Sequence, residues 1–118
     1  MSKLKEILQR KTEREEKLKS SMESITRQLI ELGALKIILF GSLAEGNVDV
    51  YSDLDMLVIM PSTRSGGEWM KFVYANVERG IDSDIIVYNQ EELREKLPTS
   101  SFLRHVLQSG RVVYEKAL

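Results

Sequence analysis

Two short motifs in this chain carry residue types suited to chemistry on phosphates. Gly41 and Ser42 directly follow an apolar run, and Asp53 and Asp55 open a second apolar run after an interval of ten residues. A glycine adds no Cβ, so the backbone N–H groups of a Gly-Ser turn can approach an anionic ligand closely, and the serine adds a hydroxyl donor. Gly41 and Ser42 therefore predict a phosphate-binding turn.

The two aspartates predict a metal site beside that turn. Asp53 and Asp55 are two residues apart, so on a strand both carboxylates point to one face while Leu54 points to the other. Like charges held this close are unfavourable unless a cation lies between them, and Mg²⁺ prefers carboxylate oxygens, waters and substrate phosphates. Each motif alone is a weak signal, because Gly-Ser turns and aspartates at strand starts are common. Their combination on neighbouring strands points to a metal and nucleotide site.

Short apolar segments are predicted to form the sheet that positions these motifs. Residues 35–40 and 54–60 are too short for buried helices, and Pro61 ends the second of them. Residues 81–88 contain a β-branched run that favours a third strand, and residues 112–114 predict a short final strand.

The first 32 residues predict a long helix. No Gly or Pro interrupts residues 2–32, and the apolar positions follow a 4-3-4-3 spacing at Leu18, Met22, Ile25, Leu29 and Leu32. Lys11 and Glu15 interrupt the same stripe further back, so the first half should pack less tightly. Pairs spaced to support an exposed helix are Glu6 with Arg10, Glu13 with Lys17 and Glu15 with Lys19. A solvated helix and a surface for self-association or partner docking are both compatible with this pattern.

Three shorter helices are expected after the second strand. An aromatic stripe from Trp69 to Val77 indicates a packing helix after a loop at residues 62–67, where Gly66-Gly67 is either a flexible hinge or a plain loop. Asn89 and Glu92 predict a capping box, and residues 99–101 can cap a last helix that ends at Gly110. The fold class is therefore α/β (α+β), a small mixed sheet packed with helices. We expect one domain over residues 1–118, with the helix at 1–32 and the core at 35–118.

Composition excludes several classes of protein. The chain has 118 residues, no Cys and a formal net charge of -1, which excludes disulfides and cysteine-bound structural zinc. Its apolar runs are far too short to cross a bilayer, and no signal-peptide core is present at the N-terminus. With 17 Lys and Arg against 18 Asp and Glu, nucleic acid is disfavoured as a partner. We expect a cytoplasmic protein.

The segments 41–46 and 52–58 together resemble the signature of the minimal nucleotidyltransferases of the DNA polymerase β superfamily: Gly-Ser, ten residues, then Asp-x-Asp. The resemblance covers nearly everything after the first helix. It implies a polymerase β-like nucleotidyltransferase fold and transfer of a nucleoside monophosphate from a triphosphate, with ATP as the favoured donor, to a hydroxyl. It also implies a two-metal Mg²⁺ site at Asp53, Asp55 and a third aspartate from a later strand. Asp84, followed by three apolar residues, matches that position best, and Asp82 is the alternative because both lie on one strand face.

The chain departs from the family pattern at Leu43 and Glu45, where members often carry basic residues. Candidates to supply replacement positive charge are Arg64, Lys71 and Arg79. The chain is also short, which leaves no second lobe for the acceptor. We therefore expect the hydroxyl to come from a Tyr or Ser of a partner protein, with the N-terminal helix as the docking surface. The resemblance offers an alternative: a catalytically weak, antitoxin-like module that pairs with a HEPN-type helical protein.

Overall fold

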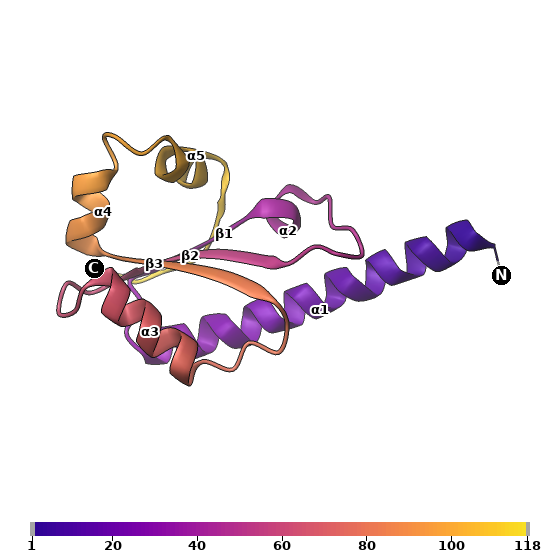
Figure 1. Cartoon of the computed structure of the whole chain (residues 1–118), viewed down its shortest axis with the longest axis horizontal. Coiled ribbons are helices and arrows are strands. Elements are labelled where there is room, and N and C mark those ends of the chain that lie inside the picture. Colours follow the sequence, from indigo (N-terminus) through magenta and orange to yellow (C-terminus); the bar gives the residue numbers. More distant parts are fainter. Residues whose placement is uncertain (1, 118) are drawn as a thin grey trace.

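The structure, a computed structural model, describes residues 2–117 and combines helices with one small sheet (Figure 1). The elements follow one another as α1 (Lys3–Glu31), β1 (Lys36–Phe40), α2 (Gly41–Glu45), β2 (Leu54–Met60), α3 (Gly66–Asn76), β3 (Ser83–Asn89), α4 (Gln90–Lys96), α5 (Ser101–Ser109) and β4 (Arg111–Glu115). No helix within residues 2–117 combines the length and apolarity needed to span a membrane.

The sheet is mixed and has the strand order β3-β2-β1-β4. The central strand β1 pairs antiparallel with both β2 and β4, whereas β2 and β3 are parallel. Helices cover both faces: α1 and α3 pack on one, and α4 and α5 lie over the other (Figure 1). The expected α+β class with a small mixed sheet is confirmed.

The long N-terminal helix is confirmed and has two unlike halves. Ser2 caps α1 by accepting a hydrogen bond from the backbone N–H of Lys5, and the helix stops before Gly33, whose φ of 105° favours glycine. The C-terminal half buries Leu18, Ile25 and Leu29 completely against the sheet. Residues 3–13, which we call the projecting segment of α1, are exposed throughout and extend beyond the sheet (Figure 1).

Three local expectations are corrected. The turn predicted at Gly41 and Ser42 is the start of the five-residue helix α2. Gly66 and Gly67 form no hinge or loop, because Ser65 caps α3 and both glycines lie in its first turn. A Cβ on Gly66 would stand 2.8 Å from the Val87 carbonyl oxygen, so close packing on β3 explains this residue. Of the three predicted charge pairs, Lys19 with Glu15 forms, at 3.4 Å. The other two form no ion pair within residues 2–117.

Candidate active site

The sheet topology brings the two motifs to one edge of the sheet. Because β1 runs antiparallel to β2, the end of β1 lies beside the start of β2, where Phe40 pairs with Asp55. Because β2 and β3 are parallel, their starts lie side by side, and Asp55 is in register with Asp84. Gly41 and Ser42 follow Phe40, so they lie beside the starts of β2 and β3, where the aspartates are.

Gly41 approaches Asp55 so closely that a side chain at this position would displace the Asp55 carboxylate. Its φ is 76°, which L side chains rarely adopt, and a Cβ at this position would meet the Asp55 carboxylate, only 3.1 Å from its Cγ. The glycine of the Gly-Ser motif thus fixes the backbone of α2 directly against a carboxylate.

The carboxylates influence one another electrostatically. Partial burial raises the pKa of Asp55, and the charges of Asp84 and Asp53 raise this pKa further. The register brings Asp84 beside Asp55, whereas the nearby contact of Asp82 is its backbone oxygen, which accepts from the Leu54 N–H at 3.2 Å. The structure therefore joins Asp53, Asp55 and Asp84 in one cluster, which we call the carboxylate cluster.

A residue that the sequence reasoning missed completes this edge. Arg14 of α1 donates from Nε to the Ser52 carbonyl oxygen at 2.8 Å, and its Nη2 lies 3.3 Å from Oδ1 of Asp53. The Arg14 side chain is 22% exposed, compared with 55% for Asp53. Arg14 lies four residues before Leu18, on the core-facing side of the helix. A charged residue on the core-facing side was the signal that could have revealed an ionic partner at the edge of the sheet.

The chemistry of the carboxylate cluster suits a divalent cation. Its donors are carboxylate oxygens, which Mg²⁺ prefers, and a cation would offset both the burial and the neighbouring charges that raise the pKa of Asp55. Within residues 2–117, no three acidic or histidine side chains lie close enough together to enclose a metal ion. Asp53 accepts a hydrogen bond from Arg14.

Of the candidates for replacement positive charge, Arg79 reaches the start of β3, where its Nη1 donates to the Ser83 carbonyl oxygen at 3.5 Å. Arg64 lies over the Trp69 ring at 5.0 Å, and Arg79 lies over the Tyr74 ring at 4.4 Å, so both are held against α3. Lys71 is an exposed residue of α3. At the departures from the family pattern, Leu43 is buried in the core and Glu45 is exposed to solvent.

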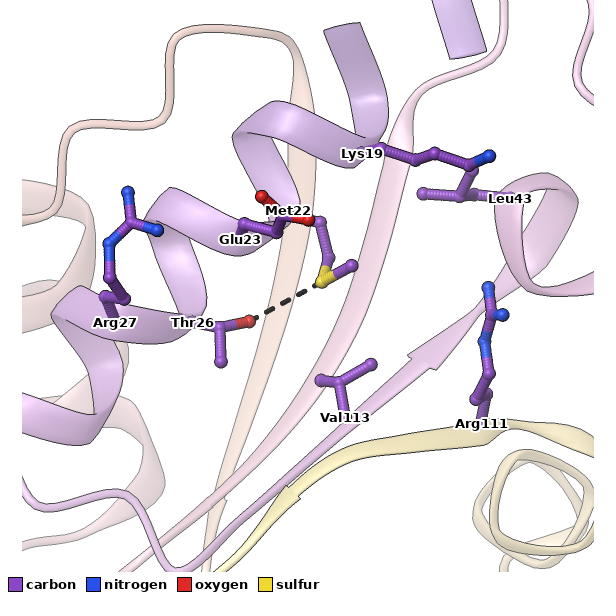
Figure 2. A pocket seen from close by; sticks show the side chains of 8 residues that line it. All are labelled: Lys19, Met22, Glu23, Thr26, Arg27, Leu43, Arg111 and Val113. Carbon is purple, nitrogen blue, oxygen red and sulfur yellow. Dashed lines mark hydrogen bonds between the residues drawn. The ribbon is translucent and has the colours of Figure 1, made fainter. Parts of the chain in front are cut away.

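A cavity of about 560 Å³ between α1, α2 and β4 is separate from the carboxylate cluster. Figure 2 shows Met22, Leu43 and Val113 around it, with Lys19 and Arg111 at its margin. Leu43 belongs to the core on the α1 face of the sheet, whereas Asp55 pairs with Phe40, which packs with the core on the α5 face. This cavity contains none of the predicted site residues.

Comparisons with known proteins identify a family and a similar fold. The family described as "Nucleotidyltransferase domain" matches residues 16–113. A crystal structure of a candidate nucleotidyltransferase from Sulfolobus solfataricus is similar in fold, with a TM-score of 0.54 and 14% identity over 93% of this chain and 87% of that chain. Among curated proteins, no sequence matches closely enough to count as a relative. The chain belongs to the nucleotidyltransferase domain family, which confirms the resemblance to the minimal nucleotidyltransferases.

Proposed function

We propose that this transferase moves a nucleoside monophosphate from a nucleoside triphosphate, with ATP as donor, to a hydroxyl acceptor in a Mg²⁺-dependent reaction. The acceptor oxygen forms a bond to the α-phosphorus, the bond from that phosphorus to the bridging β-phosphate oxygen breaks, and pyrophosphate leaves. The hydroxyl proton passes to solvent. The observation that carries this proposal is the register of Asp55 with Asp84 beside the close approach of Gly41.

Each residue of this edge has a separate role in the proposal. Asp53 and Asp55 would hold one Mg²⁺ with the triphosphate, and Asp84 with Asp55 would hold a second. Bound there, the ions would neutralise phosphate charge and lower the pKa of the attacking hydroxyl. Gly41 and Ser42 would orient the phosphates through backbone N–H groups and the Ser42 hydroxyl. The rigid strand register then keeps donor and carboxylates aligned for in-line displacement.

We further propose that the acceptor hydroxyl belongs to a Tyr or Ser of a partner protein, with a HEPN-type helical protein as the candidate. The projecting segment of α1, exposed from residue 3 to residue 13, supports this proposal because it offers a surface that the chain itself leaves uncovered.

The second candidate function is the catalytically weak, antitoxin-like module. The ion pair between Arg14 and Asp53 favours it, because that pair engages one of the carboxylates that the reaction would need.

Calorimetric titration with ATP, in Mg²⁺ and again in excess chelator, distinguishes the two functions. The enzyme should bind ATP only with the metal, and Asp53→Asn with Asp55→Asn should abolish this binding because both carboxylates are lost. Asp82→Asn is the matched control and should bind normally. Mass spectrometry of the partner after incubation with Mg²⁺ and ATP should show an added adenylyl group. Unchanged ATP affinity in the double variant would refute the metal assignment, and absent ATP binding in the unmodified protein would favour the module.

A further inference from the structure

A groove borders the carboxylate cluster on its α1 side. It lies between α1 and the connection from α2 to β2, encloses about 300 Å³, and is lined by Arg10, Glu13, Arg14, Lys17, Val50 and Tyr51. In Figure 1 the same connection runs beside the projecting part of α1. The contacts of Arg14 with Ser52 and Asp53 join the two segments. The groove therefore opens next to one of the proposed metal ligands.

The charge of the groove is positive and only partly compensated. Its lining holds three cationic side chains and one carboxylate. Arg14 is paired with Asp53, whereas Arg10 and Lys17 form no ion pair within residues 2–117. Arg10 and Lys17 are seven residues apart on α1, which puts them two turns apart on the same side of the helix. The groove thus presents two free cations in a row.

Apolar surface lies in the groove at Val50 and Tyr51 and, outside the groove, on the projecting segment of α1. Tyr51 is 87% exposed at the wall of the groove, and Leu4 and Ile7 are 66% and 43% exposed on the projecting segment. Leu4 lies fourteen residues before Leu18, close to four helical turns, so Leu4 continues the stripe that packs on the sheet further along α1. Single-stranded RNA could use the cations and Tyr51, but it would leave aliphatic side chains uncovered. An acidic protein segment with apolar residues matches both the charge and the apolar stripe.

We propose that this groove is the docking site for an acidic, amphipathic segment of the protein that supplies the acceptor hydroxyl. The proposal rests on the proposed function and adds to it the chemistry of the partner. Docking between Arg10 and Lys17 places the partner beside Arg14, one side chain away from Asp53. The hydroxyl then arrives at the edge of the sheet where the carboxylates lie.

Fluorescence anisotropy tests this proposal without nucleotide, and so independently of the transfer chemistry. The probes are a labelled random copolymer of Glu and Tyr, a copolymer of Lys and Tyr, and a single-stranded RNA oligonucleotide. The protein should bind the Glu-Tyr copolymer in preference to the other two, and more weakly as salt rises. Arg10→Glu with Lys17→Glu should weaken this binding by about tenfold or more, because each attraction becomes a repulsion.

The matched control is Lys71→Glu with Arg94→Glu, which makes the same change of net charge on exposed residues of α3 and α4. This control should bind the Glu-Tyr copolymer like the unmodified protein. Tyr51→Ser should weaken binding without any change of charge, and melting curves followed by circular dichroism verify that each variant folds. Equal losses in the two charge variants, preference for RNA, or no binding of the Glu-Tyr copolymer would each overturn the proposal. ATP binding by the unmodified protein is measured separately, so failure of docking and failure of the proposed chemistry are told apart.

Discussion

The carboxylate cluster and the projecting segment of α1 are held in the molecule in opposite ways. Three strands fix Asp55 and Asp84 through main-chain pairing, with Asp55 opposite Phe40 on one side and in register with Asp84 on the other, and Asp53 directly precedes β2. The projecting segment leaves Leu8 53% exposed and buries none of its residues. The chain's own strands thus position Asp55 and Asp84, whereas the segment has apolar surface to offer a second molecule. Nucleotide chemistry should therefore depend on the strands, and acceptor recognition on the helix.

The largest effect that would sharpen this comparison is expected at Asp84. Asp84→Asn removes a proposed ligand of the ion that activates the acceptor, so transfer should fall on the order of 100-fold while ATP binding is largely spared. Asp82→Asn is the control, because Asp82 precedes β3 and has no partner in register on β2. Rates of adenylyl transfer and calorimetric ATP affinities measure both effects. A larger loss in the Asp82 variant would reassign the third carboxylate.

The next effect concerns Gly41, where the structure offers a matched control. Gly41 and Gly46 both have φ of 76°, but only a Cβ at Gly41 would meet Asp55, since nothing lies within 4 Å of one at Gly46. Alanine at either position should cost about 1–2 kcal/mol of stability for the left-handed backbone. Gly41→Ala should also displace the carboxylate and weaken Mg²⁺-dependent ATP binding by at least about tenfold.

Melting temperature and ATP affinity, measured on both glycine variants, separate the two causes. Equal ATP affinities in the Gly41 and Gly46 variants would show that the approach of α2 to Asp55 has no importance for binding.

Arg14 is the residue at which the comparison could break, because it belongs to α1 and contacts the cluster. Anchored on the Ser52 carbonyl, it should orient the Asp53 carboxylate, and Arg14→Ala should weaken Mn²⁺ or Mg²⁺ affinity about tenfold, as loss of a hydrogen-bonding partner of a metal ligand does. Deletion of residues 2–9 removes Leu4, Ile7 and Leu8 but keeps Arg14, and it should leave metal affinity unchanged. Tighter metal binding in Arg14→Ala would mean that Arg14 competes with the cation.

The sequence predicted the motifs and the main elements because both depend on local patterns. The Asp53-x-Asp55 spacing, the Asn89 capping box and the apolar stripe of α1 can each be recognised within a few turns or one strand. The local pattern favoured Asp84 because three apolar residues follow it, but Asp82 stayed an alternative because the two share a strand face. The register between β2 and β3 puts Asp84 beside Asp55, which supports Asp84.

The features that escaped the sequence analysis depend on contacts between distant parts of the chain. The ion pair of Arg14 with Asp53 joins residues 39 positions apart. Helix α3 begins at Gly66 although glycine has a low helix propensity. Its start is set by the Ser65 cap and by Glu92, which accepts a hydrogen bond from the Gly66 N–H at 2.8 Å. Packing against β3 therefore overrides local preference there.

The carboxylate cluster should also have a cost in stability that varies with pH. Burial and two neighbouring charges raise the pKa of Asp55 in the folded state. Below the ordinary pKa of an unfolded aspartate, about 3.9, the carboxyl is protonated in both states. As pH rises from there, the unfolded state loses its proton first. Stability therefore falls until the pH has passed the raised pKa, and the penalty is constant above it.

The smallest predicted effect follows from this loss of stability at higher pH. Asp55→Asn removes a carboxylate whose charged form burial and two neighbouring charges disfavour, so at neutral pH without divalent metal the melting temperature should rise. The advantage should shrink as pH falls through the raised pKa of Asp55, because the unmodified protein then carries a neutral carboxyl too. Added Mg²⁺ should stabilise the unmodified protein and not the variant. Melting curves at several pH values, with and without Mg²⁺, provide the measurement. A variant that is less stable at neutral pH without metal would show that the structure, and not only the nucleotide chemistry, needs the charge of Asp55.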